Sequence, residues 1–291
     1  MQREITRELV RRLLPERMAE SNKGSYGSVL AAAGSMAYRG AAALCTEGAL
    51  RGGAGLVYLA SVEPVIQLVL SRTPECCACG CRTAANGGIH PQDADALRRW
   101  FADRHAVLLA GPGLGESAAD VCKALLGRNA PWAGAVLDAD ALNALAAGKY
   151  RGDLPANTIL TPHPGEAARL LALTVPKVQA DREGAAVSLA EKYHCVAVLK
   201  GHHTLVAAPD GTVWRNETGN AGLAKGGSGD VLTGVIASLM AQRADALRAA
   251  AVGVWLHGRA GDLAEQELTA YSVTPEDVVR KLPDAIREIL E

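Results

Sequence analysis

The feature that most constrains the fold is a regular alternation of short apolar runs with longer, Ala-rich segments along the chain. Runs such as 106–110 are apolar throughout. Strands buried on both faces of a parallel sheet have this pattern, and the segments between them are long enough for crossover helices. With 31 glycines and one phenylalanine, the core must be built from small aliphatic side chains. We therefore expect an α/β fold with three layers, a Rossmann-like arrangement in which helices flank a mostly parallel central sheet.

The individual elements follow from this alternation and from turn and capping residues. The expected buried strands are 28–34, 56–60, 75–81, 106–110, 135–137, 158–160 and 196–199. The expected helices are 6–14, 40–51, 64–71, 91–101, 118–126, one ending near 145, one after 166, 178–193, two between 229 and 268, one after a cap at 274, and 283–290. In the C-terminal third, strands 204–208 and 212–216 flank a Pro-Asp-Gly turn and predict a β-hairpin. No repeat, linker or change of composition divides the chain, so we expect a single domain over residues 1–291.

Charge limits the class of partner. The chain has 30 Lys plus Arg and 31 Asp plus Glu, and no block of basic residues. We therefore expect neither nucleic acid nor an anionic membrane as a partner. Residues 1–5 lack the apolar core of a signal peptide, and no later run is long enough to span a bilayer. This pattern favours a cytoplasmic protein.

Four of the seven cysteines form a cluster at Cys76, Cys77, Cys79 and Cys81. The alternate spacing of the last three places them on one face of a strand. Zinc sites normally have two-residue gaps and a second pair of ligands elsewhere in the sequence. Buried strand thiols are therefore expected rather than a metal site.

A glycine-dense stretch at 219–230 precedes the apolar run 231–240. A glycine-rich loop at the start of a helix presents bare N–H groups that bind phosphate, so Gly227, Ser228 and Gly229 are candidates for an anion hole. The Asp230 carboxylate would repel an anion, which favours a role as the base that acts on a hydroxyl beside a phosphate. The alternative is an ordinary loop with an aspartate cap.

Several known phosphate and nucleophile motifs are absent. Gly111, Gly113 and Gly115 are spaced by two, and Glu116 stands where the third glycine of a Rossmann fingerprint belongs. The sequence also lacks a Walker loop, the protein kinase segments and a serine hydrolase elbow. A nucleotide, if bound, is held by another kind of scaffold.

Unusual turns follow the predicted strands at Gly34, Ala110, Leu137, Leu160 and Leu199. In doubly wound sheets, ligands bind outside the carboxyl ends of the strands. These turns therefore predict one active-site rim.

The ordered set of motifs resembles the ADP-dependent NAD(P)H-hydrate dehydratases of the ribokinase-like superfamily. The matching segments are 23–27, 39–42, 111–115, 137–140, 161–166, 199–204 and 219–230. The resemblance implies a ribokinase-like fold and an enzyme that repairs damaged nicotinamide nucleotides. Such enzymes use ADP, or ATP in some members, to dehydrate the S epimer of hydrated NADH or NADPH (NADHX, NADPHX). The terminal phosphoryl group goes to the ring hydroxyl, and elimination of phosphate restores the ring.

The resemblance also implies roles for residues. It places the nucleotide at Lys200, Gly201, His202, His203, Thr204 and Gly229. It places the hydrate at Ala41, Gly113, His163 and Asp230, with Asp230 as the catalytic base. Mg²⁺ would bridge the phosphates with few protein ligands, so no metal motif is expected. Asp138 and Asp140 either assist this ion or cap the next helix. The resemblance further suggests a homo-oligomer and, because no epimerase domain fits before Lys23, a dehydratase alone.

Plainer interpretations of the same residues stay open. His163 lies between two prolines and is read alternatively as an exposed turn residue, Gly113 as a packing residue, and Lys200 as a solvated lysine. Ala42 is an alternative to Ala41 as the substrate contact. Adjacent strand residues face opposite ways, so His202 and His203 are expected not to form a metal pair.

Two other functions compete with hydrate repair. The first is a ribokinase-like kinase for a vitamin precursor or a sugar, which would share Asp230 and the glycine loop. The second is a nucleotide-binding regulator, which would not need the base.

Overall fold

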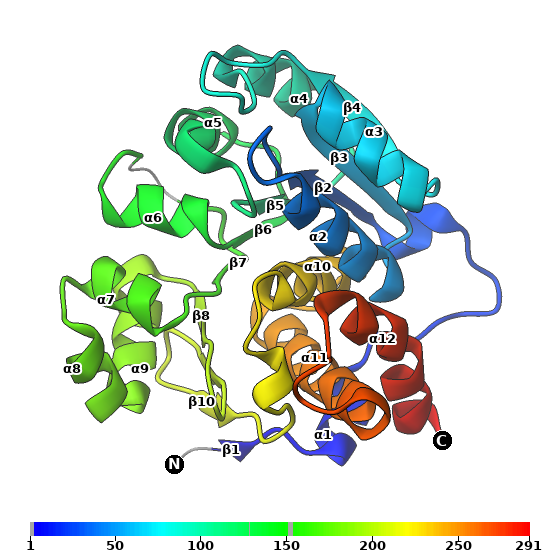
Figure 1. Ribbon diagram of the computed structural model, residues 1–291, viewed down its shortest axis with the longest axis vertical. Helices are drawn as coiled ribbons and strands as arrows, with labels where there is room; N and C mark the ends of the chain where they lie inside the picture. The colour runs from blue at the N-terminus through cyan, green and yellow to red at the C-terminus, as the bar shows by residue number, and fades with distance from the viewer. Residues whose placement is uncertain (1–2, 128, 151–153) are drawn as a thin grey trace.

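The computed structural model describes residues 3–127, 129–150 and 154–291, and it contains one sheet between two layers of helices (Figure 1). Residues 1–2, the start of the segment considered for a signal peptide, lie outside the described residues. The strands are β1 Arg3–Glu4, β2 Ser28–Ala32, β3 Leu56–Val62, β4 Cys77–Cys81, β5 Val107–Ala110, β6 Gly134–Leu137, β7 Thr158–Leu160, β8 Val196–Leu199, β9 Leu205–Ala207 and β10 Val213–Arg215. Their order in the sheet is β1-β10-β9-β8-β7-β6-β5-β2-β3-β4. Within the described part of the sheet, only β9 runs antiparallel to its neighbours.

Helices cover both faces of the sheet. On one face lie α1 Arg7–Leu13, α2 Arg39–Arg51, α3 Glu63–Arg72, α10 Ser228–Ala241, α11 Ala246–Leu268 and α12 Pro275–Leu290. On the other lie α4 Ala94–Phe101, α5 Ala118–Leu125, α6 Asp140–Ala146, α7 Pro164–Leu171, α8 Val175–Ala180 and α9 Arg182–Tyr193. The expected three-layer arrangement with a mostly parallel sheet is confirmed.

Two hydrophobic cores result, one on each face. Successive strand residues point to opposite faces, so Leu109 packs in the core beneath α2 and α10, whereas Leu108 packs in the other core. Both side chains are fully buried. A strand inside such a sheet must be apolar at every position, which is why these strands are continuous apolar runs in the sequence.

The predicted hairpin is also present. β9 and β10 pair antiparallel, and Gly211, in the turn between them, has a φ of +85° that favours glycine. The hairpin places β10 next to the outermost strand, β1, which the sequence analysis did not predict.

Two predicted helices have different boundaries. The segment expected as one helix over 178–193 is two helices, because Asp181 ends α8 and accepts a hydrogen bond from the Gly184 N–H at 2.8 Å as the N-cap of α9. The predicted break at Pro283 is wrong. This proline lies inside α12, whose apolar face continues on both sides of it and is buried at Leu282 and Ala285. Burial of that face offsets the loss of one helical hydrogen bond.

The cysteine cluster lies on β4, at the edge of the sheet. Cys77, Cys79 and Cys81 share one face, as predicted, but only Cys81 is buried and the other two are half-buried. Burial raises the pKa of Cys79 to about 11 and that of Cys81 to about 12, so both thiols are neutral near pH 7. Across the described residues, no three His, Cys, Asp or Glu side chains are arranged to hold a metal ion. Nor does any described helix have the length and apolar character needed to cross a bilayer.

Candidate active site

The five strands followed by unusual turns lie side by side. Reading across the sheet, β8, β7, β6, β5 and β2 are consecutive and parallel, so their carboxyl ends share one edge. The predicted convergence of these turns on one rim is confirmed. Helix α10 begins at this rim, where it packs against α2.

A buried ion pair occupies the middle of the rim. Lys200 follows β8, and its Nζ lies 2.6 Å from Asp138 Oδ1 and 3.9 Å from Glu166 Oε2. Only 18% of the lysine side chain is exposed, and the two carboxylates are almost fully buried. Burial alone lowers the pKa of Lys200, but Asp138, Glu166 and Asp230 together outweigh it and hold this pKa above its usual value. The alternative interpretation of Lys200 as a solvated lysine is therefore wrong.

Asp230 lies in the first turn of α10, beside this pair. Burial raises the pKa of Asp230 to about 7, and the charges of Asp138, Asp140 and Glu166 act in the same direction, while Lys200 opposes them. A carboxyl group with this pKa is half ionised near neutral pH, which is the condition for efficient proton transfer. Perturbed acids of this kind are concentrated at functional sites.

The glycine-rich loop ends close to the ion pair. Gly227 has a φ of +101°, and a Cβ there would lie 2.5 Å from Leu44 Cδ1. A Cβ on Gly229 would lie 3.2 Å from Lys200 Nζ and 3.5 Å from Asp138 Oδ2. Within the described chain, no hydrogen-bond acceptor is present for the N–H of Gly227 or Gly229, whereas the Ser228 N–H donates to the Lys225 carbonyl at 3.3 Å. Both amides are free at a helix N-terminus, and Gly229, which lies next to Lys200, is also part of the wall of an adjacent cavity.

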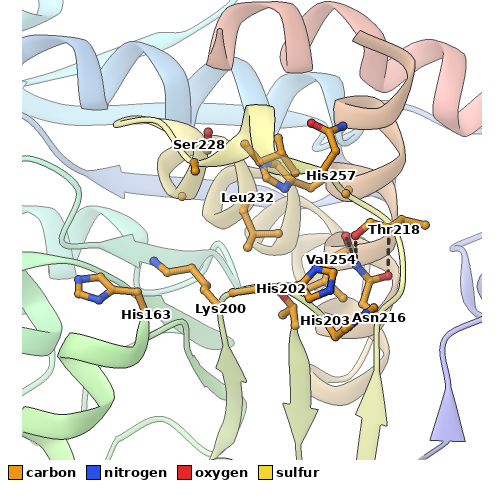
Figure 2. Close-up of a pocket in the computed structure, with 18 of the residues that line it drawn as sticks. His163, Lys200, His202, His203, Asn216, Thr218, Ser228, Leu232, Val254 and His257 are labelled. Carbon is orange, nitrogen blue, oxygen red and sulfur yellow. Dashed lines mark hydrogen bonds between the residues drawn. The ribbon is translucent and has the colours of Figure 1, made fainter. Parts of the chain in front are cut away.

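A cavity of about 710 Å³ opens beside this loop. All six predicted nucleotide-binding residues contribute to its wall, and so does His163. Figure 2 shows Lys200 and His163 at one end and Ser228, Leu232 and His257 on one side, across from His203 and Asn216. The volume suits a ligand of nucleotide size.

His163 is both a structural cap and part of the cavity wall. Its Nδ1 accepts the Gly165 N–H at 3.0 Å, and its own main-chain N–H donates to Glu166 Oε2 at 2.8 Å. Burial and the nearby charges of Lys200 and Arg169 lower its pKa, so the imidazole is neutral near pH 7. Half of its side chain is exposed. The capping role therefore does not prevent contact with a ligand.

Ala41 and Gly113 lie next to each other, outside the wall of this cavity. Gly113 has a φ of +63°, and a Cβ added there would lie 3.0 Å from Ala41 Cβ and 2.7 Å from the Tyr38 carbonyl oxygen. Ala41 is half-buried, whereas Ala42 is fully buried, so of the two only Ala41 is accessible. Asp140 holds the same loop, because its Oδ2 accepts the Gly115 N–H at 2.8 Å.

The adjacent histidines do not have the strand geometry from which their separation was expected. His202 and His203 lie in bends between β8 and β9 rather than on a strand, and their ring centroids are 3.7 Å apart. His203 has a φ of +54°, which turns the backbone so that both rings lie together. Its Nδ1 lies 2.6 Å from Glu217 Oε2.

The sequence did not single out three polar residues of the site, Glu166, Asn216 and His257, as functional candidates. Glu166 was noted only within its motif, although its spacing of three from the cap is the sign of a capping box. Asn216 is buried, and its amide donates to the Thr218 carbonyl at 3.0 Å beside the cavity. His257 is the one histidine in the apolar helix α11, and that isolation was its only signal in the sequence.

The fold and this site define the class of protein first. A crystal structure of a ribokinase-like superfamily protein from Enterococcus faecalis is 26% identical to this chain, with a TM-score of 0.83. The match covers 99% of this chain and 96% of the other. The fold is therefore ribokinase-like.

The family follows from closer matches. A family model described as NAD(P)H-hydrate dehydratase matches residues 29–284. The bifunctional NAD(P)H-hydrate repair enzyme Nnr of Moorella thermoacetica is 41% identical over 292 residues, which cover 99% of this chain and 54% of that protein. The ADP-dependent (S)-NAD(P)H-hydrate dehydratase of Bacillus subtilis is 36% identical over 282 residues, which cover 96% of this chain and 95% of that protein.

A solved structure gives the same result. The crystal structure of the ADP/ATP-dependent NAD(P)H-hydrate dehydratase from Bacillus subtilis, co-crystallised with ATP and Mg²⁺, has a TM-score of 0.85 and 35% identity. The superposition covers 99% of each chain. The chain belongs to the NAD(P)H-hydrate dehydratase family, and it spans about half the length of the bifunctional curated relatives that it matches.

Proposed function

We propose that this protein is an ADP-dependent dehydratase that converts the S epimer of hydrated NADH or NADPH back to NADH or NADPH. The observation that carries the proposal is the Asp230 carboxyl group, with a pKa of about 7, beside the free amides of Gly227 and Gly229 and the ammonium of Lys200. This arrangement combines a base with donors for a phosphoryl group. The family membership supplies the substrate class.

The nucleotide is assigned to the cavity of about 710 Å³. Its terminal phosphoryl group is assigned to the position beside Lys200 and the Gly229 N–H, with Gly227 and Ser228 as the other proposed residues of the anion hole. Residues 201–204 and the loop at 216–225 surround the rest of the nucleotide. The relative co-crystallised with ATP and Mg²⁺ supports a nucleotide co-substrate without deciding between ADP and ATP.

The hydrate is assigned to Ala41 and Gly113, which are neighbours outside the cavity wall, together with His163 and Asp230. In this assignment Asp230 takes the proton of the ring hydroxyl as the hydroxyl oxygen attacks the terminal phosphorus of ADP. The bond to the bridging oxygen breaks, and AMP leaves. The ring C–O bond then breaks with loss of a proton from the adjacent carbon, which releases inorganic phosphate and restores the dihydronicotinamide. The sum is one AMP and one phosphate for each ring repaired.

A magnesium ion fits the charge of the site. The carboxylates of Asp138, Asp140 and Glu166 all act to raise the pKa of Asp230, so a divalent cation at this rim would relieve their repulsion. Asp138 and Asp140 are the residues that would hold the ion, directly or through water. When bound, Mg²⁺ neutralises negative charge on the nucleotide phosphates.

We also propose that residues 1–291 act as one domain, that the protein is cytoplasmic, and that it forms a homo-oligomer. The continuous sheet supports the first proposal. The other two rest on the family membership and on the near-balanced charge of the chain.

Analysis of the products distinguishes a dehydratase from a ribokinase-like kinase of a vitamin precursor or sugar. Incubation with hydrated NADH, ADP and Mg²⁺ should release AMP and inorganic phosphate in equal amounts, and phosphorus NMR resolves both. A kinase would leave the phosphoryl group attached to its product. Accumulation of a stable phosphorylated product would favour that alternative, and nucleotide binding without any turnover would favour a regulator.

A further inference from the structure

His257 is a buried imidazole without an evident role in the chemistry described above. It projects from α11 into the wall of the proposed nucleotide cavity, and only 7% of its surface is exposed. Its Nε2 is shielded from solvent and has no hydrogen bond of normal geometry to any described residue. Buried polar atoms without a partner are rare and costly in free energy. The position of this ring therefore calls for a function.

The group that faces the ring is the first turn of α10. Ser228 is buried to the same extent as His257 and lies on the same side of the cavity (Figure 2). Burial lowers the pKa of His257 to about 4, while hydrogen bonding to the Ser228 main chain acts in the opposite direction. The ring is therefore neutral near pH 7 and retains one N–H to donate.

The Ser228 main chain is the part of the loop whose orientation matters most. Its peptide unit lies between Gly227 and Gly229, whose N–H groups are the free donors of the anion hole. The glycines on both sides leave this turn without side chains that would fix its conformation. Main-chain hydrogen bonds from Ser228 N–H to the Lys225 carbonyl and from Asp230 N–H to the Gly227 carbonyl hold the turn. A donor to a free lone pair of the Ser228 carbonyl would orient the peptide that carries the Gly229 N–H.

We propose that His257 is a positioning residue of the anion hole, in which Nε2–H donates to the Ser228 carbonyl oxygen when the terminal phosphoryl group is bound. The imidazole thereby holds the amide of Gly229 toward the phosphoryl oxygens. It contacts neither the substrate nor the reacting atoms. The inference rests on the proposed nucleotide site but not on the fate of the hydrate.

Three substitutions at this position separate the possible roles. Gln places an amide nitrogen near the position of Nε2, Asn places one nearer Nδ1, and Leu removes both donors while filling the space. His257→Asn and His257→Leu should weaken ADP binding about tenfold, as expected for loss of a positioning hydrogen bond, and should lower kcat. His257→Gln should recover most of both losses. His105→Asn, at an exposed position outside the cavity, is the matched control.

The decisive measurement compares ADP with AMP by titration calorimetry. AMP lacks the phosphoryl group held by the anion hole, so its affinity should not change in His257→Asn, although that of ADP falls. Equal losses for ADP and AMP would overturn the proposal, since they indicate direct contact with the adenosine part. Unchanged binding and kcat with only a lowered Tm would also overturn it, because they indicate a purely structural role. A wild-type protein that binds ADP no better than AMP would contradict the proposed function as well.

Discussion

Among individual residues, the charges at the rim explain why Asp230 can act as a base. Three carboxyl groups, those of Asp138, Glu166 and Asp230, act on the ammonium group of Lys200, and Asp140 adds a further negative charge near Asp230. Lys200 makes its closest contact with Asp138, so Asp230 lacks a full counter-charge. Lys200 and Asp230 could be predicted from the sequence as site residues. Their electrostatic interaction with Asp138 could not, because the three residues come together only through the packing of strands β6 and β8 and helix α10.

The raised pKa of Asp230 predicts the pH dependence of activity. The base must be ionised to accept a proton, so kcat/KM should rise with pH and reach half of its maximum near pH 7. Because the folded pKa exceeds the unfolded one, the native state binds the extra proton between these values, and stability should fall as pH rises through that window. Steady-state rates between about pH 5 and pH 9 test the first statement. A profile that is flat from pH 5 upward would show that Asp230 titrates normally.

Lys200 should matter for both stability and affinity. Lys200→Ala leaves Asp138 and Glu166 buried without a cation, which should cost roughly 3 kcal/mol of folding free energy and weaken ADP binding. Denaturant unfolding and calorimetry measure the two effects. Lys123→Ala, at an exposed lysine of α5, should change neither. ADP affinity equal to that of the wild type would mean that the phosphates lie elsewhere.

Among the elements, the N-terminus of α10 has the strictest requirement for particular residues. Its two consecutive glycines differ sharply in their surroundings. Gly227 combines a φ of +101° with Leu44 in the space that a Cβ would need, whereas a Cβ on Gly226 would meet nothing within 4 Å. Gly227 therefore needs to be glycine for its backbone conformation and its packing, whereas Gly226 does not.

Alanine substitutions at these two positions form a matched pair. Gly227→Ala should destabilise the protein by roughly 1–3 kcal/mol and misdirect the amides of the anion hole, so kcat should fall well beyond the loss of stability. Gly226→Ala should be close to neutral in both respects. Thermal unfolding and kcat measured side by side test the pair, and equal behaviour of the two variants would show that the loop does not impose this conformation.

The elements also show what local sequence patterns can and cannot predict. The strands are predictable because a strand buried on both faces must be apolar at every position, as in Val107–Ala110, and such a run is visible in the sequence. The helix boundaries were less predictable. Asp181 separates α8 from α9 because its side chain caps the start of α9. Pro283 does not interrupt α12, because the apolar face of α12 is buried against the rest of the core. In both cases the deciding interaction is absent from a local propensity pattern.

In the whole molecule, the sheet order brings distant segments to one edge. The turns after β2, β5, β6, β7 and β8 meet there because these strands are neighbours and parallel. The sequence predicted this rim from the general rule for doubly wound sheets. It did not reveal two residues on opposite sides of the cavity, Asn216 from the hairpin region and His257 from α11. Those positions depend on how α11 packs on the sheet, and no motif marks them.

The most direct test of the central claim is repair of hydrated NADH by the wild-type protein and by Asp230→Asn. The S epimer is incubated with ADP and Mg²⁺, and the near-ultraviolet absorbance of the restored dihydronicotinamide is followed. The wild type should restore the absorbance, whereas Asp230→Asn should be slower by a factor on the order of 10²–10⁴ while still binding ADP. No recovery by the wild type with either ADP or ATP would contradict the proposed function, and undiminished activity of Asp230→Asn would contradict the role of this residue as the base.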